Sequence, residues 1–257
     1  MTADAWWWVE RREGVVLGFT QRAPGSPDGP YRGLNLALHV GDEPERVERD
    51  RGLVIREVAT LAGVDAAEVT PAFMDQVHGA AVRVVPAADG ASGPVGACDA
   101  LVTTTPRVAL FSLVADCTPV LLVDPSAQVA AAVHAGRPGM VAGVVPAAVA
   151  EMRARGARRI SAVVGPSVCG RCYEVPEEMR AQVSAVEPVS ASVTWSGTSA
   201  LDVAAGVVEQ LRREDVAVSW IPGCTREDER LYSYRRDGRT GRFAGVVMLT
   251  GAAGATG

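Results

Sequence analysis

Two histidines and one cysteine could bind a metal ion together, although they lie far apart in the sequence. His78 stands in MDQVHG, Cys117 in VADCTPVLLVD and His134 in AAVHAG. Each ends an apolar run that is typical of a strand, and a Gly or Pro follows within two residues. Imidazole and thiolate are ligands of catalytic zinc sites, which keep a fourth position open for water. The alternative is that all three are ordinary core residues, since free cysteine is often buried.

The other histidine and cysteines carry weaker signals. Cys169 and Cys172 form a C-x-x-C pair in CGRC, typical of redox or zinc pairs, but no second C-x-x-C follows. We interpret CGRC as a packing element or a wall of the site, without a disulfide. Cys98 and Cys224 have no visible partner and are expected in the core. His39 is expected to be structural or close to the site.

The composition limits the classes of protein and chemistry. The 257 residues are 48% hydrophobic and 21% charged, with a net charge of −5, which argues against nucleic acid or membrane as partners. All basic residues are arginine, so a Schiff-base lysine and a P-loop lysine are excluded. Five cysteines without a signal peptide predict reduced thiols and a cytoplasmic location.

The elements that must position these residues are mixed strands and helices in one domain spanning residues 1–257. Absence of strict βαβ alternation favours the α+β class. Asp42 and Glu45 resemble a capping box before a helix over Glu43–Ala62 that stops at Gly63. Further helices are expected over Met140–Arg155 and Leu201–Arg213. Strands are expected over Trp6–Val9, Val15–Arg22, Phe73–His78, Ala81–Val85, Leu101–Thr104, Val108–Ala115, Val120–Val123, Val129–His134, Ile160–Val164, Val216–Ile221 and Phe243–Leu249.

One late segment, LYSYRRDGRTGRFAG, concentrates arginine beside two tyrosines. It can be read as a solvated turn between strands, and this interpretation is favoured from the sequence alone. The alternative is an anion-binding loop, since guanidinium pairs with phosphate through two hydrogen bonds.

Seven motifs resemble those of one family in the same order: NLALHVGD, QVHG, CDALVTT, ADCTPVLLVD, AAVHAGRPG, GPSVCGRCYEV and LYSYRRDGRTGRFAGVV. The chain resembles the YfiH-like family, long named polyphenol oxidase or laccase-domain proteins and now described as purine nucleoside phosphorylases, from about Asn35 to Leu249. The resemblance implies an α+β fold with a central β-sandwich of mixed sheets between helices, layered α-β-β-α. It also implies one zinc ion per chain, bound by His78, Cys117 and His134.

The resemblance further implies phosphorolysis of adenosine, inosine, guanosine or methylthioadenosine, together with adenosine deamination. The implied partners are thus purine nucleoside and phosphate, and the chain would be a monomer or a small homo-oligomer. Asp116 is expected to support the ligand cysteine as part of the catalytic set. Candidate contacts for substrate or phosphate are Arg32, Asn35, Arg137, Arg235 and Arg236.

Two positions depart from the family pattern. The family usually reads HAGWRG, whereas Arg137-Pro138 stands here in place of Trp-Arg, which displaces the arginine and removes the aromatic ring. VADC also replaces the commoner TADC, which removes one hydroxyl. The first change bears on any base-stacking or phosphate role of the Trp-Arg pair, and the second is milder.

Two other functions remain open from the sequence. Cys117 could be the nucleophile of a hydrolase that edits muropeptides of the cell wall, or the chain could be a metal-binding accessory protein without turnover. A multicopper laccase is excluded, because its trinuclear cluster needs more imidazoles than the three histidines of this chain provide.

Overall fold

Two β-sheets pack face to face in the computed structural model, which describes residues 5–12, 14–22, 29–86 and 95–251. The strand order is β1-β2-β13-β6-β3 in one sheet and β12-β9-β7-β8-β5-β4 in the other, and β10 and β11 form a separate pair. The strands are β1 (Trp6–Arg12), β2 (Val15–Thr20), β3 (Thr70–Phe73), β4 (Val82–Val84), β5 (Ala100–Thr103), β6 (Val108–Val114), β7 (Thr118–Asp124), β8 (Val129–Ala135), β9 (Ser161–Val164), β10 (Ala191–Val193), β11 (Ser199–Leu201), β12 (Ala217–Trp220) and β13 (Phe243–Leu249).

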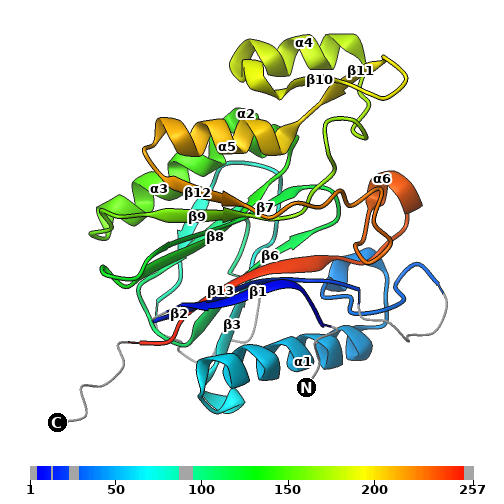
Figure 1. Ribbon diagram of the computed structural model, residues 1–257. Helices are drawn as coiled ribbons and strands as arrows, with labels where there is room; N and C mark the ends of the chain where they lie inside the picture. The colour runs from blue at the N-terminus through cyan, green and yellow to red at the C-terminus, as the bar shows by residue number, and fades with distance from the viewer. Residues whose placement is uncertain (1–4, 13, 23–28, 87–94, 252–257) are drawn as a thin grey trace.

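Helices cover the outer faces of both sheets. In Figure 1, α1 lies below the five-stranded sheet, and α2, α3 and α5 lie above the six-stranded sheet, with α4 and the β10–β11 pair beyond them. The helices are α1 (Pro44–Ala62), α2 (Arg137–Ala142), α3 (Val144–Ala154), α4 (Glu177–Val186), α5 (Val203–Arg213) and α6 (Tyr234–Asp237), with short 3-10 turns η2 (Leu38–Val40), η3 (Ala66–Glu68) and η4 (Pro188–Ser190). The order of layers is therefore α-β-β-α.

Successive side chains of the central strands point to opposite faces of their sheet, and this divides the core into layers. In β7, Leu121 and Val123 pack between the two sheets, whereas Val120 and Leu122 pack against the helices above. In β6, Leu110 likewise faces the other sheet, while Phe111 packs toward α1. Because both faces of these strands are covered, they read as continuous apolar runs.

Both sheets contain parallel and antiparallel pairs. β7 pairs antiparallel with β8 and β9, while β9 pairs parallel with β12 and β3 pairs parallel with β6. Mixed sheets with helices outside confirm the α+β class and the layered sandwich expected from the sequence.

The predicted helices differ from the structure mainly at glycines. The helix predicted over Glu43–Ala62 is confirmed as α1, and it stops at Gly63 in the left-handed conformation, with φ 73°. The predicted capping box is wrong, because Glu43 is the N-cap and Asp42 accepts hydrogen bonds from Glu43 N and Asn35 Nδ2. The helix predicted over Met140–Arg155 is two helices, since Gly143 turns the chain with φ 82°.

Most predicted strands are confirmed within a few residues, and one is displaced. The strand predicted over Phe73–His78 is wrong beyond its first residue, because β3 runs from Thr70 to Phe73 and His78 lies in the following loop. α4, α6 and the β10–β11 pair were not predicted. α6 has only four residues, and its sequence was interpreted as a turn.

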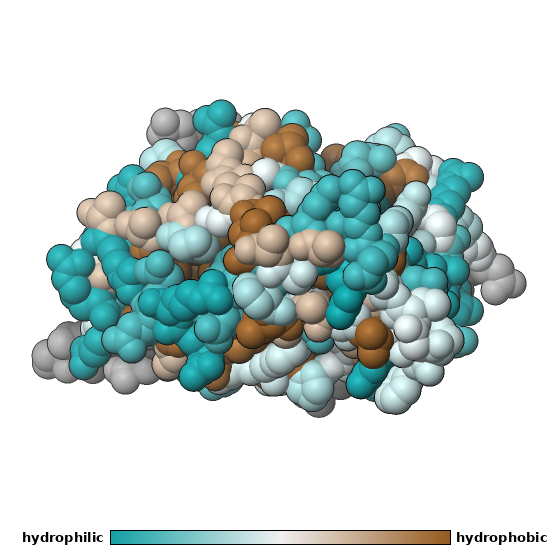
Figure 2. Space-filling view, turned by 90° about the horizontal axis from the view of Figure 1, so that it is seen from above, coloured by the Kyte–Doolittle hydropathy of each residue, from teal (hydrophilic) through white to brown (hydrophobic). Residues whose placement is uncertain are grey.

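The outer surface is mixed in polarity. Seen from above, on the side of α4 and α5, hydrophobic residues form separate small patches between hydrophilic ones (Figure 2). None of the helices within the described ranges combines the length and the apolar character needed to cross a bilayer.

Candidate metal centre and the surrounding cavity

His78, Cys117 and His134 lie together in the structure, as predicted from their settings in the sequence. One nitrogen or sulfur atom from each lies within 4.8 Å of the others. Cys117 Sγ is 3.8 Å from His78 Nε2, and the two imidazole rings stand edge to face with centroids 4.8 Å apart. Three donor atoms from distant segments thus face one point.

The antiparallel pair β7–β8 brings two of these residues together. Thr118 pairs with Ala135 and Pro119 with His134, so the start of β7 lies beside the end of β8. Cys117 immediately precedes β7, and His134 is the second-last residue of β8. The register of one hairpin therefore fixes the separation of the thiol and the buried imidazole.

His78 reaches the site from a loop rather than from a strand end. Its backbone has a φ of 60°, an uncommon value for a residue with a side chain. The Gln76 side chain holds this loop against β6, donating to Leu113 O at 2.7 Å and accepting from Leu113 N at 2.8 Å. The amide of Gln76 thus replaces the backbone partner that a longer β3 would have supplied.

Asp99 orients both histidines and was not singled out from the sequence. Its carboxylate lies 2.8 Å from His134 Nδ1 and accepts hydrogen bonds from His78 N at 3.0 Å and Gly79 N at 2.6 Å. With Nδ1 occupied by the carboxylate, the Nε2 of His134 is left as its ligating nitrogen. The signal available in the sequence was an acid directly before the apolar run of CDALVTT, and the structure shows that this acid is fully buried.

Gly136 lies so close to the donor atoms that no larger residue fits there. A Cβ atom at this position would lie 2.8 Å from His78 Cδ2 and 3.1 Å from Cys117 Sγ. The glycine of the HAG motif therefore leaves the space that the His78 imidazole and the Cys117 thiol occupy.

Burial influences the protonation of the donor side chains and of Asp99. It lowers the pKa of His134, against the opposing effect of Asp99, so that the neutral imidazole needed by a metal is favoured. Burial and Asp116 raise the pKa of Cys117 to about 12. Burial also acts to raise the pKa of Asp99, but the hydrogen bond from His134 and those from the backbone outweigh it, and the pKa is lowered.

The donor set fits a divalent metal ion such as zinc. Zinc binds imidazole nitrogen at about 2.0–2.1 Å and thiolate sulfur at about 2.3 Å, so its ligand atoms lie roughly 3.3–3.8 Å apart. The observed separations need only a small contraction to meet these values. The carboxylate behind His134 is the usual partner of a metal-bound imidazole. These observations support binding of one metal ion at this point.

The three side chains open into a cavity of about 420 Å³. This volume falls in the range of pockets that bind small molecules. Apolar residues form part of the wall, together with two tyrosines and several polar groups. The lining residues are His39, Gln76, His78, Leu113, Val114, Ala115, Asp116, Cys117, His134, Arg137, Val168, Tyr173, Val203, Tyr234, Arg235 and Arg242.

Arginines give the cavity positive charge. Arg137 lies at the first position of α2, directly after the glycine of HAG, and its buried Nε has no hydrogen-bond partner among the described residues. Arg235 stacks on Tyr173 with 4.8 Å between guanidinium and ring centroid. Arg242, not among the predicted contacts, is partly buried and donates to the carbonyls of Thr240 and Gly241. Burial lowers the pKa of its guanidinium.

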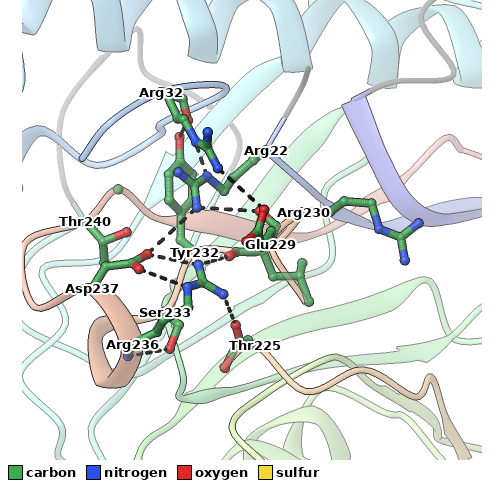
Figure 3. Close-up of polar contacts among 12 residues, drawn as sticks. Arg22, Arg32, Thr225, Glu229, Arg230, Tyr232, Ser233, Arg236, Asp237 and Thr240 are labelled. Carbon is green, nitrogen blue, oxygen red and sulfur yellow. Dashed lines mark hydrogen bonds and ion pairs between the residues drawn. The ribbon is translucent and has the colours of Figure 1, made fainter. Parts of the chain in front are cut away.

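Three predicted substrate contacts lie elsewhere. Arg32 lines a separate surface cavity, with its guanidinium 3.9 Å from Glu229. Arg236 is held by Asp237 and by the carbonyls of Thr225, Asp228 and Leu231, as Figure 3 shows in part. Asn35 is fully buried and bonds to Asp42, to Ala37 and to the backbone N of Arg242. None of the three lines the metal cavity.

Asp116 organises the loop that forms one wall of the cavity. With φ 95°, it accepts hydrogen bonds from Thr225 Oγ1 at 2.6 Å, Ser233 Oγ at 2.7 Å and Arg235 N at 2.6 Å. Its carboxylate thus joins the β6–β7 turn to the segment that contains Arg235. It touches the metal donors only through the chain, as the neighbour of Cys117.

His39 lines the cavity, and Cys98 is buried, in agreement with their interpretation from the sequence. Cys169 and Cys172 are free thiols, as expected. The prediction for Cys224 is wrong, because its sulfur is half-buried and lies beside both of them. Sequence spacing gave no sign of this contact, since 52 residues separate Cys172 from Cys224.

Comparison with known proteins agrees with this architecture. Residues 16–250 match the family described as multi-copper polyphenol oxidoreductase laccase. A purine nucleoside phosphorylase of Streptomyces coelicolor is 54% identical over 241 residues, covering 92% of this chain and 96% of that protein, and one of Streptomyces griseus is 49% identical, covering 94% and 99%. The crystal structure of a Neisseria meningitidis protein has a TM-score of 0.82 at 31% identity, covering 96% and 100% of the two chains.

A solved YfiH protein of Bacillus licheniformis has a TM-score of 0.80 at 27% identity, with 91% of this chain and 92% of that one covered. The likeness in sequence and in fold thus extends over nearly the whole chain. The matched range, residues 16–250, spans the positions of His78, Cys117 and His134. The chain therefore belongs to the YfiH-like, laccase-domain family.

Proposed function

We propose that this protein is a zinc-dependent purine nucleoside phosphorylase. The observation that carries the proposal is the His78, Cys117 and His134 donor set in the wall of a cavity that arginines also line. The name of the Streptomyces relatives supports the same reaction. The substrates would be adenosine, inosine, guanosine or methylthioadenosine, together with inorganic phosphate.

The cavity wall contains groups that suit phosphate and groups that suit a purine base. Arg137, Arg235 and Arg242 supply guanidinium groups that suit a phosphate dianion. Leu113, Val168 and Val203 supply apolar surface for a purine, and Tyr173 and Tyr234 supply rings on which a base can stack. The displaced arginine of this chain, Arg137, still lines the cavity.

In phosphorolysis, an oxygen of phosphate forms a bond to C1′ of the ribose while the bond from C1′ to the purine nitrogen breaks. The electron pair of that bond leaves with the purine, which takes up a proton. The arginines hold the attacking phosphate, and the apolar wall holds the base and excludes water. His78, Cys117 and His134 would hold a zinc ion, which would supply a Lewis acid in the wall of the cavity.

The geometry also supports adenosine deamination as a second activity. A zinc ion held by His78, Cys117 and His134 would activate water as the nucleophile of this reaction. Addition of water at C6 of adenosine, with loss of ammonia, yields inosine. The test is inosine formation from adenosine in buffer without phosphate, with C117S as the inactive control.

The thiol-hydrolase alternative has less support. A nucleophilic cysteine needs a lowered pKa, whereas burial raises that of Cys117. A cation at the site would turn this thiol into a ligand rather than a nucleophile. We therefore expect the Cys117 sulfur to resist iodoacetamide in the metal-loaded protein and to become reactive only after chelation.

The deciding experiment measures zinc content and phosphorolysis in the same preparations. Purified protein, chelator-treated protein and protein reloaded with zinc are assayed with adenosine and phosphate for adenine and ribose 1-phosphate. Activity should follow occupancy of the His78 site and should require phosphate. C117S should lose phosphorolysis and the zinc of the His78 site, whereas C98S, which removes a buried thiol outside the cavity, should keep both. Full phosphorolysis by zinc-free protein would refute the proposal.

A further inference from the structure

A second group of metal-binding side chains lies outside the proposed active site, on two turns of the same form. In Cys169–Cys172 the backbone N of Cys172 donates to the carbonyl of Cys169 at 2.9 Å. In residues 224–227 the backbone N of Glu227 donates to the carbonyl of Cys224 at 3.1 Å. Each turn therefore directs the first and fourth side chains to the same side.

Backbone contacts place these turns against each other. Ser167 and Cys224 form an isolated parallel bridge, with Ser167 N donating to Gly223 O and Thr225 N donating to Ser167 O. The backbone N of Cys169 donates to Cys224 Sγ at 3.5 Å. A backbone donor of this kind stabilises negative charge on sulfur, as it does for thiolate ligands.

The four side chains converge as a result. The sulfur atoms of the three cysteines and a carboxylate oxygen of Glu227 all lie within 4.8 Å of one another. The thiol of Cys172 donates to Glu227 Oε1 at 3.2 Å, and all three thiols are free. Cys172 is buried while Glu227 is exposed, so an ion could enter from solvent on the carboxylate side.

We propose that Cys169, Cys172, Cys224 and Glu227 bind a second zinc ion, at a site distinct from the His78 centre. Thiolate and carboxylate are both ligands of tetrahedral zinc, and sulfur atoms bound at about 2.3 Å lie about 3.8 Å apart. The observed separations are within about 1 Å of that arrangement. Binding releases the three thiol protons to solvent and changes no oxidation state.

Simple packing of buried cysteines does not account for this arrangement. Cys98 shows what packing alone looks like, because it is buried in the hydrophobic core and its sulfur donates to a backbone carbonyl, that of Gly96, at 3.4 Å. The thiols of Cys169, Cys172 and Cys224 instead meet one another and a carboxylate across two chain segments. A site with every protein position filled, as here, is of the structural kind.

Such an ion would hold a wall of the active-site cavity in place. The next residue after Cys224 is Thr225, which donates to Asp116, and the residue before Cys169 is Val168, whose N donates to Asp116 O at 3.0 Å. The second zinc therefore stabilises the segments on both sides of Asp116 without contacting substrate.

Metal stoichiometry tests the site independently of catalysis. Protein purified with reductant is loaded with excess zinc, gel-filtered and analysed for zinc per chain. The wild type and the C98S control should each bind two ions. C172S should retain one, H134N should retain one, and the double variant should retain none. C172S should also melt at a lower temperature, while its remaining zinc still supports phosphorolysis.

Cobalt substitution keeps the test decisive if C172S folds poorly. Cobalt(II) bound by three thiolates absorbs more strongly in the near ultraviolet than cobalt bound by one, so H134N should show the stronger thiolate band per ion. E227Q should weaken binding at this site alone. One zinc per chain in the wild type, unchanged in C172S, would overturn the proposal. So would thiol titration showing Cys169 and Cys172 joined in a disulfide in reductant-treated protein.

Discussion

The carboxylate of Asp99 contacts Nδ1 of His134 at 2.8 Å and, through two backbone N–H groups, also fixes the loop of His78. One buried acid thus orients two of the three metal donors. A carboxylate in this place holds the imidazole tautomer whose other nitrogen faces the ion.

Replacing Asp99 by Asn should therefore weaken zinc binding at the His78 site about ten- to hundredfold. The amide keeps one acceptor, but its NH₂ group must face either His134 Nδ1 or the N–H of Gly79. Chelator competition in the C172S background measures the His78 site alone. D116N is the matched control. It should keep its zinc affinity, because the Asp116 carboxylate bonds to Thr225, Ser233 and Arg235 N rather than to a metal donor. Equal affinities for the two variants would contradict this role of Asp99.

Asp116 should affect turnover rather than metal content. Both oxygens of the Asp116 carboxylate accept hydrogen bonds, from Thr225 and Ser233 at one and from Arg235 N at the other. In D116N one of these oxygens becomes an NH₂ group, so at least one of the three donors faces another donor. We expect kcat/KM for nucleoside to fall about tenfold or more, since small displacements of positioning groups have effects of this size. T225V, which removes one of the three contacts and keeps the shape, should have a smaller effect. Steady-state kinetics at constant zinc occupancy distinguish the two.

Cys117 and His134 could be predicted from the sequence because their signals were local, whereas His78 lies in a loop and not at the strand end expected for it. Long apolar runs identified β6, β7 and β8, and the polar residues at their ends could be recognised within each run. Asp99 and Arg242 required the tertiary fold, since each acts on residues more than 30 positions away. Arg32 and Arg137 could not be separated by sequence, because both stand next to glycine or proline and only the path of the chain places one in the cavity. Glycine positions decided the helix boundaries, as Gly143 shows.

Arg137 should be a determinant of phosphate binding. Its buried Nε has no partner among the described residues, so R137A removes a donor that the protein itself does not use. Loss of a charged hydrogen bond of about 1.5–3 kcal/mol predicts a KM for phosphate raised roughly ten- to hundredfold. R137K should recover only part, because lysine lacks the planar fork of donors. R32A is the control, and its KM for phosphate should match the wild type, since Arg32 lines another cavity. An equal rise in both variants would refute the assignment.

Asp124 should make stability depend on pH in the acid range. This buried carboxylate closes the β7–β8 turn, accepting from the N and Oγ of Ser126 and from the N of Ala127, Arg158 and Arg159. Burial acts to raise its pKa, but these hydrogen bonds outweigh burial and lower the pKa to about 2. Because the folded pKa lies below the unfolded one, the stabilisation is fully present above about pH 5 and is lost as pH falls toward 2.

The free energy of unfolding of D124N should accordingly lie below that of the wild type at pH 7, and the gap should narrow by roughly 2 kcal/mol between pH 5 and pH 2. In D124N an amide NH₂ group opposes backbone donors at every pH, so the variant lacks the titrating contribution. Urea denaturation at a series of pH values measures this difference in the free energy of unfolding. D215N is the control, because Asp215 is exposed and the substitution removes no buried hydrogen-bond acceptor. A gap that stays constant over this range would show that the Asp124 carboxylate has the same pKa in the folded and unfolded chain.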